Sequence, residues 1–178
     1  MKKKAEIYLA WVCFWGTEHF LKQIRGVEHT ETGYANSTLP HPSYKQVCTG
    51  DTHAAETVHV VYDADILGLE FLLELYFKTI DPTSLNRQGE DHGTQYRTGI
   101  YYTDASDLPV IRQAVDVLAA QYEAPVVVEV LPLENFYSAE DYHQDYLDKN
   151  PTGYCHINPA LFAWARKANA EASGDQSL

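Results

Sequence analysis

The order of the periodic apolar segments is the sequence feature that most limits how this chain can fold. Short valine-rich or alternating stretches, typical of buried strands, are followed by longer stretches in which apolar side chains recur at helical spacing. From the N-terminus the order is strand, helix, strand, strand, helix, strand, helix, strand. We expect the strands at 6–12, 27–34, 56–62, 95–102 and 126–131, and the helices at 13–25, 65–79 and 104–122.

This order predicts an α+β fold of two layers, a mixed sheet with its helices on one face, of the ferredoxin-like sandwich type. Residues 35–53 and 86–94 have no sustained period, so they are expected to be loops, and long loops in compact domains are often functional. After the last strand we expect an irregular C-terminal segment with one short helix at 139–147. The 178 residues suit a single domain, 1–178, with 171–178 as a disordered tail.

The composition argues against several classes of protein. The net charge is −12 and the sequence pI is about 4.9, whereas binding to nucleic acid requires a basic surface. Glu6 interrupts the apolar run that follows the N-terminal lysines, and no apolar run is long enough to cross a membrane, so neither a signal peptide nor a membrane partner is expected. The eight histidines have no paired-ligand spacing, so we expect neither a metal nor a cofactor.

The three cysteines, Cys13, Cys48 and Cys155, have no CxxC spacing and are odd in number, which fits a reducing compartment such as the cytoplasm. Cys13 closes the apolar run 7–12 and opens a segment with helical spacing, so it is expected at a strand-to-helix junction. The positive end of a helix dipole stabilises a thiolate and lowers the thiol pKa from about 8.5. Cys13 is therefore a candidate nucleophile, although a cysteine in an apolar run is about as often a small core residue.

The segment Cys13-Phe14-Trp15-Gly16 resembles the signature of the A-type peptide methionine sulfoxide reductases. Further matches to that family follow in the same order, over about residues 7–155, and so many in one order argue against coincidence. They are Gly33-Tyr34, His41-Pro42-Ser43-Tyr44, Val47-Cys48-Thr49-Gly50, Ala55-Glu56, Tyr62-Asp63, Gly93-Thr94-Gln95-Tyr96-Arg97 and Glu140-Asp141-Tyr142-His143-Gln144-Asp145-Tyr146.

The resemblance implies an enzyme that reduces the S epimer of methionine sulfoxide, free or in proteins. Cys13 would attack the sulfoxide sulfur, and Glu56 would donate a proton to the departing oxygen. Glu56 opens a valine-rich strand, where burial would raise its pKa, although a carboxylate at a strand end is otherwise more often a surface group. The hydroxyls of Tyr44 and Tyr96 would hydrogen-bond the oxygen as negative charge grows on it, and Asp91 would orient the acid through water or hold its loop.

The resemblance also implies how the thiol is recycled. Phe14 and Trp15 would hold the S-methyl group of the substrate against their rings. After oxygen transfer Cys13 becomes a sulfenic acid, which Cys155 would convert to a disulfide for thioredoxin to reduce. Cys48 matches a family cysteine without a catalytic role and is expected to be a buried thiol.

The chain departs from the family at two places. Trp11-Val12 stands where the family usually has glycines, and His53-Ala54-Ala55 stands where it tends to have Gly-His-Ala before the acid. The first departure leaves open a second hypothesis, a protein that binds sulfoxides or oxidised peptides with impaired turnover. A third hypothesis, a cysteine-based peroxide sensor, requires only Cys13 and Cys155.

Overall fold

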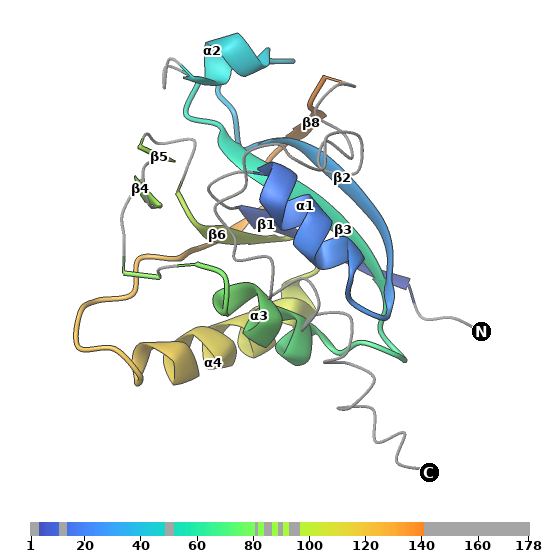
Figure 1. Cartoon of the computed structure of the whole chain (residues 1–178), viewed down its shortest axis with the longest axis vertical. Coiled ribbons are helices and arrows are strands. Elements are labelled where there is room, and N and C mark those ends of the chain that lie inside the picture. The colour runs from blue at the N-terminus through green and yellow to red at the C-terminus, as the bar shows by residue number, and fades with distance from the viewer. Residues whose placement is uncertain are drawn as a thin grey trace.

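The computed structural model describes residues 4–10, 14–48, 52–80, 82–83, 87–88, 91–92 and 97–140. The predicted strands and helices occur in the predicted order, with four short elements in addition, two of which lie in the expected loop 86–94 (Figure 1). The strands are β1 (Lys4–Ala10), β2 (Val27–Ala35), β3 (Ala55–Asp63), β4 (Arg87–Gln88), β5 (Asp91–His92), β6 (Gly99–Tyr102), β7 (Glu129–Pro132) and β8 (Phe136–Ser138). The helices are α1 (Phe14–Lys22), α2 (Tyr44–Cys48), α3 (Leu69–Phe77) and α4 (Leu108–Ala119), the last preceded by a 3-10 turn at Ala105–Asp107.

Six strands form one mixed sheet in the order β7-β6-β1-β3-β2-β8. The pair β6–β7 is parallel, and the other pairs in this sheet are antiparallel. The N-terminal strand β1 lies inside the sheet, where it pairs with β3 along its whole length and with β6 over its last three residues. The predicted α+β class with a mixed sheet is therefore confirmed.

One face of the sheet packs against the helices. Side chains alternate along a strand, so Ile7 and Leu9 of β1 lie on this face while Tyr8 and Ala10 lie on the other. Ile7 and Leu9 are fully buried in a cluster to which all three long helices contribute, which confirms the prediction of helices on one face. The cluster includes Phe20 and Leu21 from α1, Ile24 from the turn after it, Leu72, Leu73 and Tyr76 from α3, Ile111, Ala114 and Leu118 from α4, and Val58, Val60 and Tyr62 from β3.

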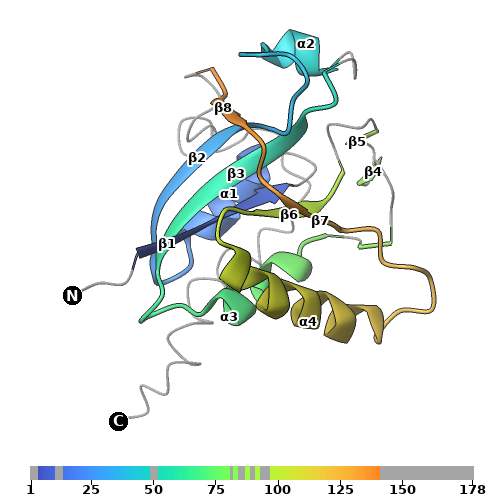
Figure 2. The same ribbon diagram turned by 180° about the vertical axis from the view of Figure 1, so that it is seen from behind.

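The opposite face of the sheet carries a smaller cluster with many rings. The ring of Tyr8 stacks on His59 with ring centres 4.2 Å apart, and Phe136 of β8 packs against both. Nε2 of His59 lies 2.7 Å from a carboxylate oxygen of Glu6. Seen from behind, β7 and β8 run across this side of the molecule (Figure 2).

The segment 35–53, predicted to be a loop, contains the short helix α2. Its start is fixed by a reciprocal capping box. The Ser43 backbone N–H donates to Oε1 of Gln46 at 2.9 Å, and the Gln46 backbone N–H donates to the Ser43 hydroxyl at 3.2 Å. The Ser-x-x-Gln spacing was the available signal for a helix starting at Tyr44.

The edge strand β8 was also not predicted. β8 pairs with β2 from Gly33↔Ser138 to Ala35↔Phe136, although its three residues have no strand signal of their own. A Cβ at Gly33 would lie 2.7 Å from Cε2 of Phe136, so only glycine lets β8 pack here. The strand predicted from residue 126 begins at Glu129, because Val127 donates instead to the Pro82 carbonyl at 2.7 Å.

Other boundaries also differ from the prediction. The strands expected from residues 6 and 95 begin at Lys4 and Gly99, and the helices expected to end at residues 25 and 79 end at Lys22 and Phe77. The helix expected from residue 104 begins at Leu108, because Asp104 caps a 3-10 turn by accepting from the Ser106 backbone N–H at 2.9 Å. The helix expected at 139–147 does not include Ala139 or Glu140, and its remainder lies outside the described residues, as does the predicted tail 171–178. In the part of the chain that the structure describes, no helix is long and apolar enough to cross a membrane.

Candidate active site

Four strands begin or end on the same side of the main sheet, and we call this line of strand ends the edge at which the site lies. Ala10, the last residue of β1, is opposite Thr57 of β3 and Gly99 of β6. Ala35, the last residue of β2, is opposite Ala55, the first residue of β3. The C-terminal ends of β1 and β2 therefore lie beside the N-terminal ends of β3 and β6, with α2 beyond this edge (Figure 1).

One predicted site residue lies here among the described residues, and two others belong to segments that adjoin these strands in the sequence. Glu56 is the second residue of β3, Cys13 lies between the end of β1 and Phe14 at the start of α1, and Tyr96 shortly precedes β6. Cys13 and Tyr96 themselves lie outside the described residues. The strand before Cys13 and the helix after it are confirmed, so the predicted strand-to-helix order around this cysteine holds.

Glu56 is buried on the helix-covered face of the sheet. Its place in the alternation of β3 is that of Val58 and Val60, which lie in the main core cluster. The residue is 2% exposed and its Oε2 is shut off from solvent. This burial rules out a surface carboxylate, and desolvation of a carboxyl group disfavours its charged form.

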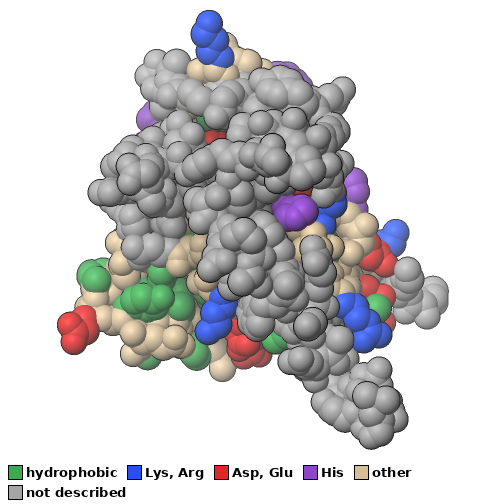
Figure 3. Space-filling view, viewed as in Figure 1, with side chains coloured by type: hydrophobic (Ala, Val, Ile, Leu, Met, Phe, Trp, Pro, Cys, Tyr) green, Lys and Arg blue, Asp and Glu red, His purple; other side chains and the backbone are tan. Residues whose placement is uncertain are grey.

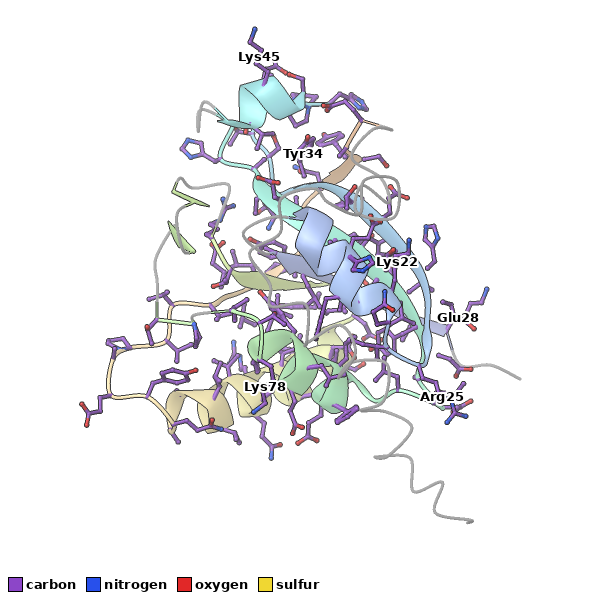
Figure 4. The ribbon with its side chains drawn as sticks, viewed as in Figure 1. Lys22, Arg25, Glu28, Tyr34, Lys45 and Lys78 are labelled. Atoms are coloured by element: carbon purple, nitrogen blue, oxygen red, sulfur yellow. The ribbon has the colours of Figure 1, made fainter. Side chains whose placement is uncertain are left out.

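Tyr34, which was not among the predicted site residues, is the residue opposite Glu56 in the β2–β3 pair. It is fully buried, and its hydroxyl lies 3.4 Å from Oε1 of Glu140. The Ala139 backbone N–H donates to the Thr32 carbonyl at 2.9 Å, which holds the chain before Glu140 against β2. Figure 4 shows Tyr34 near the end of the sheet, toward α2. The place of Tyr34 beside Gly33 in a family motif was the only sequence signal for it.

The helix α2 is anchored next to the start of β3. Val47 is fully buried and shares the main core cluster with Ala54, two residues before Glu56. The backbone of Tyr44, at the first position of α2, is therefore held at this edge. The side chains of Tyr44 and Cys48 lie outside the described part of the chain.

The remaining candidates are placed less completely. Phe14 and Trp15 form the start of α1, and Asp91 lies in β5, where it pairs with Gln88 of β4. The backbones of these three residues are described and their side chains are not. Cys155 lies outside the described residues.

A fully buried tyrosine ties two of the strand ends together. The hydroxyl of Tyr76 in α3 donates to the carbonyl of Ala10, at the end of β1, and lies 3.5 Å from the carbonyl of Gly99, at the start of β6. Burial raises the pKa of Tyr76, so the hydroxyl stays a donor at neutral pH. This contact fixes the last residue of β1, three residues before Cys13.

A charged cluster lies at the same edge on the face away from the helices. Nε of Arg97 lies 2.5 Å from Oε1 of Glu129, and one of its terminal nitrogens donates to the His53 carbonyl at 2.8 Å. The hydroxyl of Tyr101 donates to the same Glu129 oxygen at 2.9 Å, and burial raises the pKa of Tyr101. The cluster connects the start of β6 with the segment that enters β3.

A separate hollow lies between α3 and α4, away from the strand ends. Its lining includes Phe77, Ile80, Val117 and Tyr122. Apolar side chains are visible over this part of the molecule in Figure 3. It contains none of the predicted site residues. Among the described residues no three His, Cys, Asp or Glu side chains are grouped so that they could hold a metal ion.

Comparisons with known proteins agree with the resemblance. The family model described as peptide methionine sulfoxide reductase matches residues 5–173. A peptide methionine sulfoxide reductase MsrA of Lachnoclostridium phytofermentans is 53% identical over 162 residues, which cover 91% of this chain and 98% of the relative. The chain therefore belongs to the peptide methionine sulfoxide reductase family. It is an oxidoreductase, and its reaction is the reduction of methionine sulfoxide.

Solved structures show the same fold. The reduced form of Mxr1 from Saccharomyces cerevisiae has a TM-score of 0.81 at 39% identity, covering 86% of this chain and 89% of that one. Mxr1 in complex with Trx2 has a TM-score of 0.58 at 23% identity, covering 81% of this chain and 85% of that one.

Proposed function

We propose that this chain reduces the S epimer of methionine sulfoxide, free or in proteins, through a sulfenic acid on Cys13. The observation that carries the proposal is the burial of Glu56 at the edge where β1 ends and α1 begins, on either side of Cys13. A carboxyl group shielded from water keeps its proton more readily than one at the surface, which suits a proton donor at neutral pH.

In the first step the Cys13 thiolate attacks the sulfoxide sulfur while the Glu56 carboxyl protonates the oxygen. The S–O bond of the sulfoxide breaks, the oxygen is transferred to the Cys13 sulfur as a sulfenic acid, and methionine leaves. The substrate sulfur gains two electrons and the Cys13 sulfur loses two, so the step balances without a further reductant. General acid catalysis of this kind contributes about 10²–10⁴-fold to a rate.

Other candidates are assigned to binding and charge stabilisation. The hydroxyls of Tyr44 and Tyr96 donate to the sulfoxide oxygen as its negative charge grows. Phe14 and Trp15 hold the S-methyl group against their rings. Asp91 orients the acid through water or holds its loop. The anchoring of α2 beside β3 supports the assignment of Tyr44, since Val47 packs in one cluster with Ala54.

In the second step the Cys155 thiol attacks the Cys13 sulfenic acid, water leaves, and a disulfide forms. Thioredoxin then reduces this disulfide by thiol–disulfide exchange. The existence of a complex of Mxr1 with Trx2 supports thioredoxin as the reductant. A cytoplasmic location, expected from the cysteine usage, stays a prediction.

We also propose that the fold is a ferredoxin-like sandwich. The strands β1, β2, β3 and β6 lie in the order β6-β1-β3-β2, with α1 between β1 and β2 and α3 between β3 and β6. Strands β7 and β8 are then additions at the two edges. This arrangement, with the helices on one face, supports the assignment.

The catalytic assignments are tested by incubating excess protein with racemic methionine sulfoxide and dithiothreitol. The parent is expected to consume half of the racemate, Cys13→Ser none of it, and Glu56→Gln half of it about 10²–10⁴-fold more slowly. Chromatography of the methionine formed gives both yield and rate. Turnover by Cys13→Ser, or consumption of the whole racemate, contradicts the proposal. A parent that binds the sulfoxide without reducing it supports the binding hypothesis instead.

The resolving step is tested with Cys155→Ser. This variant should still form about one equivalent of methionine per protein without reductant, because the first step needs only Cys13 and the acid. Its thioredoxin-supported turnover should fall steeply, while the matched control Cys48→Ser behaves like the parent. Loss of that turnover in Cys48→Ser and not in Cys155→Ser would move the resolving role to Cys48.

A further inference from the structure

Arg97 connects two chain segments that enter the proposed site. Its terminal nitrogen donates to the His53 carbonyl at 2.8 Å, three residues before Glu56. Arg97 itself directly follows Tyr96 in the sequence. Because the donors of a guanidinium group lie in one rigid plane, a bond from one of them fixes the direction of the others.

The segment held by Arg97 has an unusual backbone. His53 has φ of 54°, in the left-handed region, which is unfavourable for a residue with a side chain. Neighbouring bonds hold this turn in place. The Thr38 backbone N–H donates to the Thr52 carbonyl at 2.8 Å, and the Ala54 backbone N–H donates to the Thr52 hydroxyl at 3.3 Å. The contact with Arg97, which is 44 residues away in the sequence, holds the peptide that joins His53 to Ala54.

Arg97 is in turn held by Glu129. Its Nε lies 2.5 Å from the Glu129 carboxylate, which also accepts the Tyr101 hydroxyl at 2.9 Å. The Glu129 backbone N–H donates to the Thr98 carbonyl at 3.0 Å, so this carboxylate is fixed to the start of β6 by backbone and side chain. The side chains of Arg97 and Glu129 are 16% and 31% exposed, so solvent screens the pair only in part.

We propose that Arg97 is a positioning residue for the sulfoxide reductase reaction and acts through Glu56. By holding the His53 carbonyl it sets where β3 begins, and thereby where the Glu56 carboxyl lies relative to the sulfoxide oxygen. Proton transfer requires heavy atoms at hydrogen-bond distance, and a displacement of about 1 Å can cost about 10²-fold in rate. The inference rests on the proposed role of Glu56 as the proton donor.

The test measures single-turnover reduction of methionine sulfoxide as a function of its concentration, for Arg97→Gln in the parent and in Glu56→Gln. In the parent the maximal rate should fall at least about tenfold while the half-saturating concentration changes less than about threefold, because the acid acts in the transition state. In Glu56→Gln the same change should have little effect, since two residues that act as one unit are not additive. The matched control is Arg112→Gln, on an exposed part of α4, with no expected effect.

Glu129→Gln is the second variant, and it decides the matter if Arg97→Gln does not fold. It keeps the size of the side chain, and it should cause a smaller loss of rate that is likewise absent in the Glu56→Gln background. Far-ultraviolet circular dichroism checks that each variant is folded. Equal losses in both backgrounds, or rates like that of the parent in both variants, overturn the inference and leave the proposed function intact. A Glu56→Gln protein as fast as the parent instead overturns the assignment of the acid, and this inference with it.

Discussion

Replacing Tyr76 by Phe should destabilise the protein through one buried hydroxyl. The ring stays, so no large cavity forms, but the carbonyl of Ala10 loses its donor and the carbonyl of Gly99 loses a weaker contact at 3.5 Å. Tyr76 is fully buried, so water does not replace the hydroxyl. Leaving a buried acceptor short of a partner costs about 1–3 kcal/mol. For a chain of this size each kcal/mol lowers the melting temperature by about 2–4 °C.

The assay is urea unfolding followed by circular dichroism, with the free energy of unfolding extrapolated to water. The control is Tyr62→Phe, which removes the same atom from a tyrosine that is 2% exposed and whose hydroxyl makes no hydrogen bond among the described residues. We expect the control to change the free energy of unfolding by less than about 0.5 kcal/mol. Equal effects of the two substitutions would refute the reasoning, because the loss would then come from the ring environment and not from the bond to Ala10.

Two further perturbations test the fold. Gly33→Ala should destabilise the protein by about 1–3 kcal/mol in the same assay, because the new Cβ would lie 2.5 Å from the Tyr137 carbonyl oxygen, a backbone atom that cannot move aside. The control is Gly68→Ala, where a Cβ meets open space and should cost under about 1 kcal/mol. Similar losses of stability for both substitutions would contradict the packing argument. Burial raises the pKa of Tyr8 from 10.0 to about 12, with Glu6 and Glu31 adding to the effect, so its contribution to stability is complete below pH 10 and is lost as the pH rises through 12. Urea unfolding at several pH values in this range should show that the free energy of unfolding declines less steeply with pH for Tyr8→Phe than for the parent. Parallel declines in the two proteins would contradict this role of Tyr8.

The parts of the fold that local pattern determines were predictable. The alternation of β3 was predicted correctly, since burial of one face imposes its period on the sequence. The apolar stripe of α4 was predicted in part, because Ile111, Ala114 and Leu118 are buried whereas Val110 and Val117 are exposed. β8 was not predictable in this way, because three residues carry no period and pairing depends on the space that Gly33 leaves in another strand. The short helix α2 lay between these cases, since its capping box is visible in the sequence but its five residues are too few for a stripe.

In the candidate site, too, features that depend on local sequence were predictable and features that depend on distant contacts were not. The burial of Glu56 was expected from its place at the head of a valine-rich strand, and its exposure of 2% bears this out. The contact of Arg97 with Glu129 joins residues 32 positions apart, and no local pattern encodes which carboxylate a guanidinium meets. Tyr34 became a neighbour of Glu56 only through the register of β2 against β3, which depends on the whole sheet.

The place of β1 inside the sheet has a consequence for how the protein is made. β1 emerges from the ribosome well before its partners, since Tyr8 pairs with His59 and with Tyr101. Until residue 102 has been synthesised, β1 lacks a neighbour on one side, and the N–H and C=O groups of that edge are unpaired. Pairing over such sequence separations is slow to form and prone to aggregation. The strand that precedes Cys13 is therefore completed late, and an unfinished chain does not hold the end of β1 between two paired neighbours.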